Sequence, residues 1–134
     1  MRLKQKVAIV TGGASGIGKA TAELFAQEGA KVVVADWNKE AGVQTASTLS
    51  NAGHNALYCF ADVSKSQDVE VLVQTTVNHY GKLDVLVNNA AVQILARLVE
   101  TAEEVWDRIQ SVNLKGVFLG CKFAIPPMIK GGGG

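Results

Sequence analysis

The sequence predicts an α/β fold in which helices cover both faces of a parallel sheet. Short, β-branched apolar runs alternate with longer segments of helical periodicity, and each run is almost continuously apolar, which is typical of strands buried on both faces. Strands that are joined through helices pair in parallel through right-handed crossovers, so this alternation favours a doubly wound sheet. The four predicted strands are Val7–Val10, Lys31–Asp36, Asn55–Ala61 and Leu83–Asn88.

Glycines mark the ends of the three helices predicted between these strands. Gly29, Gly53 and Gly81 each follow the last periodic apolar residue of a helical segment, where a C-terminal cap is expected. By analogy with doubly wound sheets, we expect the strand order 3-2-1-4. A ligand crevice is then expected between the first and fourth strands, where the order reverses.

A fourth helical segment, from about Ala102 to Ile125, is apolar on two sides. One apolar side consists of Val105, Ile109, Val112, Gly116, Leu119 and Phe123. The other consists of Leu114, Phe118, Cys121 and Ile125. A helix that is apolar on two sides must be covered on two sides, so we expect the sheet against one side and further chain or a partner subunit against the other. We expect Pro126-Pro127 to end this helix.

Length and composition indicate a single domain that spans residues 1–134. Hydrophobic residues make up 48% of the chain and the formal net charge is +1, so the chain can bury a core and has no strongly charged surface. We therefore expect neither nucleic acid nor a charged membrane as a partner. The apolar run Val7–Val10 is too short for a signal peptide, and no segment is long enough to span a bilayer.

The cysteines and histidines predict no disulfide and no metal site. Cys59 and Cys121 lie far apart in apolar surroundings, which indicates buried free thiols in a reducing compartment and hence a cytoplasmic location. His54 and His79 are isolated from other metal-ligating residues in the sequence. We therefore expect no metal cofactor.

A glycine-rich turn with the pattern Thr11-Gly12-x-x-x-Gly16-x-Gly18 follows the first predicted strand. Without side chains at these glycines, the main chain can turn sharply and bring its N–H groups to a phosphate, and the helix that begins there adds the positive end of its dipole. The turn therefore predicts a dinucleotide pyrophosphate site, and an ordinary strand-to-helix loop is the alternative. The cofactor-binding residues predicted in this turn are Gly12, Ser15, Gly16, Ile17 and Gly18.

Asp36 stands at the end of the second predicted strand, eighteen residues after Gly18. A carboxylate there can accept hydrogen bonds from the ribose hydroxyls of an adenosine, and it would repel the extra phosphate of NADP. Two unit charges about 4 Å apart interact by roughly 4 kcal/mol at an effective dielectric constant of about 20. Asp36 therefore predicts NAD rather than NADP, with Trp37 near the adenosine; a solvated aspartate at a strand end is the alternative.

Five motifs stand in the order found in one known family. They are Thr-Gly-x-x-x-Gly-x-Gly at residues 11–18, Asp36, Asp62-Val63, Asn88-Asn89-Ala90 and Asn113. Over essentially all of its 134 residues the chain resembles the short-chain dehydrogenase/reductase family, which implies a Rossmann-like NAD-binding domain. Ala91 stands where the family's Asn-Asn-Ala-Gly motif has a glycine, and it adds a methyl group where backbone and ribose pass closely.

The resemblance implies further contacts with the adenosine half of the cofactor. In these motifs the implied cofactor-binding residues are Asp62, Val63, Asn89 and Ala90. Asp62 would hold the adenine amino group, and the alternative is that Asp62, or Ser64, caps the third helix. Ala90 would lie beside the ribose, while Asn88 would steady the sheet.

Asn113 lies within the long apolar helical segment, where asparagine is a poor helix former and costly to bury without a partner. The resemblance implies that Asn113 belongs to the catalytic group, where it holds a water molecule beside the active-site lysine. The alternative is a structural hydrogen bond that bends the helix.

The family's remaining catalytic residues, a serine and a Tyr-x-x-x-Lys pair, have no counterpart here. Tyr58 and Tyr80 are followed four residues later by Asp62 and Asp84, so neither forms the pair. We expect a sheet that is incomplete after the fourth strand and the helix that follows it. The fourth strand would then expose an unpaired apolar edge.

Together these observations predict the cofactor half of an oxidoreductase that transfers hydride between the nicotinamide of NAD and an alcohol or carbonyl substrate. We expect no turnover by this chain alone. A non-catalytic NAD-binding sensor or scaffold is one alternative, and a fragment too incomplete to hold the cofactor is another. Family members commonly pair through the long helix, so the resemblance also implies a homo-oligomer through residues 102–125.

Overall fold

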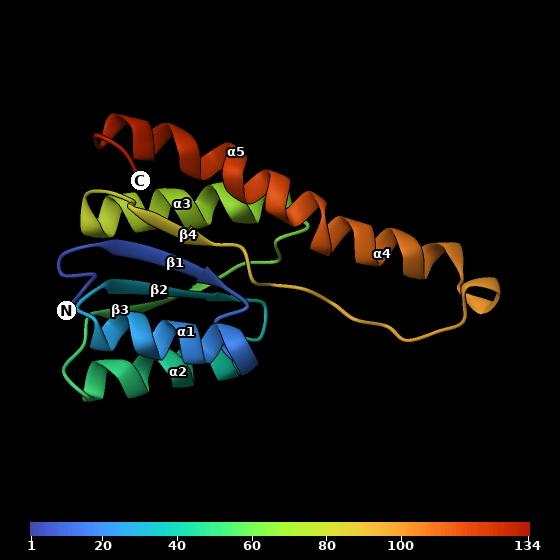
Figure 1. Ribbon diagram of the computed structural model, residues 1–134, viewed down its shortest axis with the longest axis horizontal. Coiled ribbons are helices and arrows are strands. Elements are labelled where there is room, and N and C mark those ends of the chain that lie inside the picture. The colour runs from blue at the N-terminus through green and yellow to red at the C-terminus, as the bar shows by residue number, and fades with distance from the viewer.

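The computed structural model describes all residues 1–134, and it contains a parallel sheet with helices on both faces (Figure 1). All neighbouring strands pair in parallel, and their order is β3-β2-β1-β4. This confirms the predicted doubly wound α/β fold and the strand order 3-2-1-4. The strands are β1 (Val7–Thr11), β2 (Lys31–Asp36), β3 (Ala56–Phe60) and β4 (Val85–Val87).

Helices pack on each face of the sheet (Figure 1). The helices are α1 (Gly16–Gln27), α2 (Lys39–Asn51), α3 (Ser66–Tyr80), α4 (Glu103–Asn113) and α5 (Lys115–Lys130), with a 3-10 turn η1 (Leu98–Glu100) before α4. Alternate residues of β1 and β2 point to opposite faces, so Val10, Val32 and Val34 pack under α1 and α2. Ile9 and Val33 pack under α3 and α5 on the other face.

The helix ends agree with the glycine signals in the sequence. Gly29, Gly53 and Gly81 have φ angles of 88°, 87° and 82°, which is the left-handed region that favours glycine. Each follows the end of α1, α2 or α3 by no more than two residues. The predicted helix stops are therefore confirmed.

Burial differs between the central and outer strands. β1 and β2 are buried along almost their whole length, as predicted for strands covered on both faces, whereas β3 and β4 are only half-buried. β4 is also shorter than predicted, because only Val85–Val87 pairs with β1 and no strand lies on its outer side. β3 and β4 are the two edge strands of the sheet, which explains their lower burial, and the missing partner on its outer side explains why β4 is short.

The C-terminal helical segment corrects two predictions. It consists of two helices, α4 and α5, which are separated at Leu114. The second helix continues through Pro126 and Pro127 to Lys130, so the prediction that these prolines end the helix was wrong. The fixed φ of proline is close to the helical value, so two prolines in the last turns cost N–H hydrogen bonds without forcing the chain out of the helix.

The two-sided apolar character of this segment is confirmed. Val112, Leu119 and Ala124 are buried, whereas Leu114 and Phe118 on the other side are 66% and 60% exposed. Figure 1 shows α4 and the loop before it extending beyond the end of the sheet. No helix combines the length and the hydropathy that crossing a lipid bilayer requires.

Candidate functional site

A pocket of about 550 Å³ lies at the carboxyl ends of the strands, in the size range of small-molecule sites. The segments that follow all four strands contribute to it, and α4 adds two residues, Arg108 and Val112. This is the crevice expected where the strand order reverses between β1 and β4. The predicted cofactor-binding residues that line it are Gly12, Ser15, Gly16, Ile17, Asp36, Trp37, Asp62, Val63, Asn89 and Ala90.

The glycine turn fits closely against the loop after β4. Gly12 has a φ of 64°, and a Cβ atom there would come within 3.0 Å of the Cα atom of Ala90. Gly16 has a φ of 50° and faces open space. Gly18, which was predicted to bind the cofactor, is not among the residues that line the pocket, and a side chain there would collide with the carbonyl group of Gly12. Gly18 therefore lets α1 pack against the turn.

The first turn of α1 is open to an anion. Ser15 occupies the N-cap position, but its side chain makes no capping hydrogen bond, and the first turn contains no acidic residue. The N–H groups at a helix start have no partners within the helix, and they carry the positive end of the dipole. Gly16 and Ile17, the first two residues of α1, line the pocket, so the start of the helix faces it. The unpaired N–H groups at the start of α1 therefore suit a phosphate group.

Asp36 ends β2 as a buried carboxylate that is 7% exposed. One oxygen, Oδ2, accepts a hydrogen bond from the backbone N–H of Ala14 at 3.1 Å, and Oδ1 accepts one from that of Asn38 at 2.9 Å. The alternative of a solvated aspartate was therefore wrong. The carboxylate ties the glycine turn to β2 and lines the pocket beside the exposed Trp37.

Asp62 follows β3, and its side chain is held by Ser64, two residues further along the chain. Its Oδ1 atom accepts hydrogen bonds from the N–H of Ser64 at 3.0 Å and from the Ser64 hydroxyl at 2.6 Å. Partial burial of Asp62 opposes its ionisation, but these hydrogen bonds and the charges of Arg108 and Lys65 prevail and lower its pKa. Since α3 begins at Ser66 with Lys65 at the N-cap, the alternative of a cap by Asp62 or Ser64 was wrong.

Asn89 and Thr11 join the end of β4 to the glycine turn. The Asn89 side-chain amide donates to the carbonyl oxygen of Thr11 at 3.0 Å. The Thr11 hydroxyl oxygen accepts the backbone N–H groups of Asn89 and Ala90 at 3.0 and 3.1 Å. Asn88, which was expected to steady the sheet, directs its amide to the sulfur of Cys121 on α5, 3.7 Å away, and so joins the end of β4 to that helix.

Asn113 ends α4 and lies outside the lining of the pocket. Its Oδ1 atom accepts the backbone N–H of Val92 at 2.8 Å, and its Nδ2 atom donates to the carbonyl oxygen of Val92 at 2.9 Å. The helix breaks at the next residue, Leu114. These are the structural hydrogen bonds of the alternative interpretation, and they hold the loop after β4 against α4.

Neither tyrosine lies in the pocket lining. The Tyr58 hydroxyl donates to the backbone carbonyl of Asp36 at 3.0 Å, and burial raises the pKa of both Tyr58 and Tyr80. Both cysteines are free but half-buried, which corrects the prediction that they are buried. No group of three or more His, Cys, Asp or Glu side chains could hold a metal ion.

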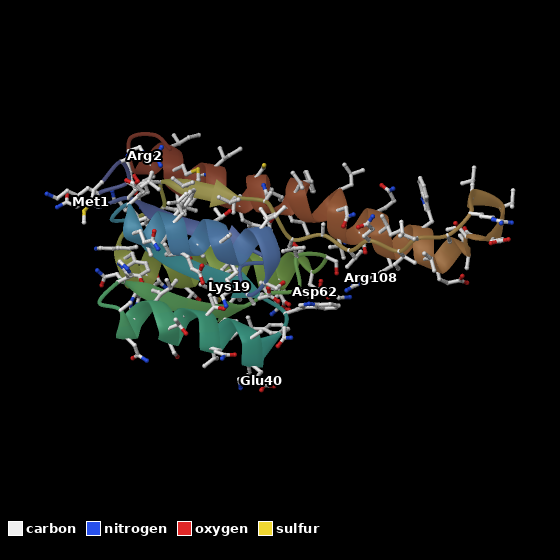
Figure 2. All side chains as sticks on the ribbon, turned by 60° about the horizontal axis from the view of Figure 1, so that its bottom comes forward. Met1, Arg2, Lys19, Glu40, Asp62 and Arg108 are labelled. Atoms are coloured by element: carbon white, nitrogen blue, oxygen red, sulfur yellow. The ribbon has the colours of Figure 1, made fainter.

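Sequence reasoning missed the contribution of α4 to the pocket. Figure 2 shows Arg108 and Asp62 approaching each other, and the Arg108 Nη1 atom lies 3.7 Å from the Asp62 Oδ2 atom. The Arg108 guanidinium also lies over the ring of Trp37, 5.2 Å from its centre. The sequence carried no signal for these contacts, because they depend on how α4 is docked. The other lining residues without a predicted role are Ala61, Ala91, Val92, Gln93 and Val112.

The fold and the pocket define a nucleotide-binding domain of the Rossmann type. The family model described as short chain dehydrogenase matches residues 6–134. This chain belongs to the short-chain dehydrogenase family, as the sequence motifs indicated.

Curated relatives match nearly all of the chain. An uncharacterized oxidoreductase from Thermotoga maritima is 43% identical over 134 residues, which are 100% of this chain and 53% of the relative. A tropinone reductase-like 1 protein from Erythroxylum coca is 49% identical over 96% of this chain and 48% of its own length. A meso-2,3-butanediol dehydrogenase from Serratia marcescens is 39% identical over 97% of this chain and 51% of its own length. The chain spans about half the length of the curated relatives it matches.

Proposed function

We propose that this chain forms the NAD-binding half of an oxidoreductase that transfers hydride between nicotinamide and an alcohol or carbonyl substrate. The observation that carries the proposal is the pocket at the switch point, where the uncapped start of α1 and the Asp36 carboxylate line one crevice. Membership of the short-chain dehydrogenase family and relatives named as oxidoreductase and dehydrogenase support it.

In this proposal, different residues bind different parts of the cofactor. The first-turn N–H groups of α1 bind the pyrophosphate, and the absence of a side chain at Gly16, which faces open space, lets it approach the backbone. Asp36 accepts hydrogen bonds from the adenosine ribose, and Asp62 accepts one from the adenine amino group. When bound, the dinucleotide supplies the hydride carrier, and the chain's own residues bind and orient it.

The preference for NAD over NADP rests on the charge of Asp36. Its carboxylate already accepts two backbone hydrogen bonds, so it is held rigidly at the end of β2. A 2′-phosphate bound beside it would bring like charges together with a repulsion of up to about 4 kcal/mol at close range. We therefore expect NAD to bind at least about tenfold more tightly than NADP.

Asn113 is the one residue of the proposed catalytic group that this chain contains. The oxygen and the nitrogen of its side-chain amide both bond to the backbone of Val92. We therefore propose that Asn113 first holds the loop after β4 beside the end of the pocket that would receive the nicotinamide. Holding a water molecule there would require a further lone pair of its Oδ1 atom. We expect this chain alone to bind the cofactor without turning over a substrate.

We also propose that copies of the chain associate through the exposed apolar side of α4 and α5. Leu114, Phe118 and Ile125 form this side, and large exposed apolar side chains on one helix face favour a protein partner. The two free cysteines support a cytoplasmic location. Sedimentation of the chain and of the Phe118→Glu variant tests the association, which this variant should weaken.

A fluorescence titration tests the proposed function. Trp37 borders the pocket and is 58% exposed, so its emission should change when a dinucleotide binds. We expect a change at lower concentrations of NAD than of NADP, and the Asp36→Ala variant should narrow that difference. A folded chain that responds to neither dinucleotide would contradict the proposal.

A further inference from the structure

Arg108 reaches from the middle of α4 across one end of the pocket. It is the only lysine or arginine among the lining residues. Its Nη1 atom lies 3.5 Å from the Ser64 hydroxyl oxygen and 3.7 Å from the Oδ2 atom of Asp62. The same guanidinium lies over the Trp37 ring, 5.2 Å from the ring centre. Arg108 therefore joins the segments that follow β2 and β3 to α4.

The two oxygens of Asp62 are used differently. Oδ1 accepts both hydrogen bonds from Ser64, so its two lone pairs are occupied. Oδ2 has only the Arg108 charge, at a distance longer than a hydrogen bond. The guanidinium thus balances the charge of the carboxylate while Oδ2 keeps its capacity to accept a hydrogen bond.

Trp37 adds a second contact to the ion pair between Arg108 and Asp62. Pairs of exposed charges often contribute little, because two long side chains must be held in one geometry. Here the guanidinium lies over the ring of Trp37, a cation–π contact that stabilises arginine and restricts its rotation. The Arg108 side chain is 35% exposed and the Asp62 side chain 20%, so the pair is only partly screened by water.

We propose that Arg108 is a positioning residue for the adenine end of the dinucleotide. Supported by Trp37, it fixes Asp62 so that Oδ2 accepts a hydrogen bond from the exocyclic amino group of adenine. This inference rests on the proposed function, because it requires the pocket to bind NAD. It gives α4 a part in recognising the base, which no motif of the sequence indicates.

The test compares NAD with nicotinamide hypoxanthine dinucleotide, in which a carbonyl oxygen replaces the adenine amino group. For the unmodified chain we expect the dissociation constant of the hypoxanthine analogue to be about tenfold higher than that of NAD, because a hydrogen bond to a charged group is lost. In Arg108→Met the NAD affinity should fall and this discrimination should shrink to about twofold or less. Arg108→Lys keeps the charge but not the planar group, so it should restore part of the discrimination.

Arg97→Met is the matched control, because Arg97 is exposed and lies outside the pocket lining. We expect it to leave both dissociation constants unchanged. Equal losses for NAD and the hypoxanthine analogue in Arg108→Met, or unchanged discrimination, would overturn the inference. Failure of the unmodified chain to bind either dinucleotide would instead overturn the proposed function.

The contact with Trp37 has its own readout. In a Trp106→Phe background, Trp37 is the only tryptophan, so its emission reports on the guanidinium above it. We expect Arg108→Met to change this emission in the absence of ligand, with a thermal unfolding midpoint close to that of the background chain. Unchanged emission would contradict the cation–π contact between Arg108 and Trp37.

Discussion

The two walls of the pocket are built in different ways. On the glycine-turn side, backbone groups of the turn take part in the contacts: the Ala14 N–H donates to the Asp36 carboxylate, and the Gly12 and Ala90 backbones meet closely. On the α4 side, side chains span the distance, through Arg108 to Asp62 and Asn113 to Val92. The first wall rests on the buried strands β1 and β2, whereas α4 extends beyond the sheet.

This difference indicates which parts of the site unfold together. Changes to the backbone-built wall should affect the global stability of the domain, because they disturb its buried sheet. Changes to the α4 wall should loosen one segment and leave the sheet intact, since local regions with few buried contacts open independently. Substitutions at Gly18 and Asn113 test this comparison directly, and one at Asp84 adds a buried contact away from the pocket as a reference; they follow in order of decreasing expected effect.

The largest effect is expected at Gly18. An alanine there would overlap the carbonyl group of Gly12 and the Asn89 side chain, and neither the turn nor the start of α1 can move without disturbing β1. We expect Gly18→Ala to lower the free energy of unfolding by about 3 kcal/mol, measured by urea denaturation. Gly53→Ala is the control, because Gly53 has a positive φ but open space, and it should cost only about 1–2 kcal/mol. Equal costs would show that close packing at Gly18 is unimportant.

Asp84 anchors the other end of the sheet. Its buried carboxylate accepts the N–H of Val7 at 2.8 Å and pairs with Lys82 at 2.9 Å and Lys6 at 3.3 Å. We expect Asp84→Asn to lower stability by about 2–3 kcal/mol, because it removes a buried charge from its partners. Asp107→Asn, at an exposed position on α4, should change stability by less than about 0.5 kcal/mol.

The same carboxylate gives a pH dependence. Burial raises the pKa of Asp84, but the hydrogen bonds from Lys82, Val7 and Lys6 outweigh it and lower the pKa below its ordinary value. A lowered carboxyl pKa contributes stability that is present above the ordinary value near 4 and is lost as the pH falls through the folded-state value. The unmodified chain should therefore lose stability in acid more steeply than Asp84→Asn. Parallel acid profiles would contradict this assignment.

The smallest global effect is expected at Asn113. Asn113→Ala removes both hydrogen bonds to Val92, which should cost about 1–2 kcal/mol locally. We expect faster amide exchange at Val92 and faster proteolysis between residues 91 and 102, while amide exchange in β1 stays unchanged. Asn78→Ala, at an exposed position on α3, is the control. Faster exchange throughout the sheet would mean that the two walls are not independent.

The sequence predicted the backbone-built wall well, because its determinants are local. The turn glycines, the continuous apolar strands and the helix-ending glycines each act on neighbouring residues, and they led to the fold and to the turn residues that line the pocket. The exception is Gly18, whose absence of a side chain serves packing against Gly12 rather than the pocket. Spacing alone does not distinguish these two uses of a glycine.

The α4 wall was predicted poorly, because its contacts depend on tertiary placement. The break at Leu114, the continuation of α5 through Pro126 and the position of Arg108 over Trp37 have no local signature. Asn113 was recognised as unusual for a helix interior, but its partner Val92 lies in a loop that no pattern positions. Predicting that wall required knowing how the loop after β4 docks against α4.

In the proposed complex, the dinucleotide occupies the crevice with its pyrophosphate at the start of α1. The most direct test is a titration of the ¹⁵N-labelled chain with NAD, followed by NMR of the backbone amides. We predict that the largest shifts occur at Gly12, Gly16 and Ile17, which line the pocket. Unmoved amides at these positions, with shifts confined to residues outside the pocket or absent altogether, would contradict it.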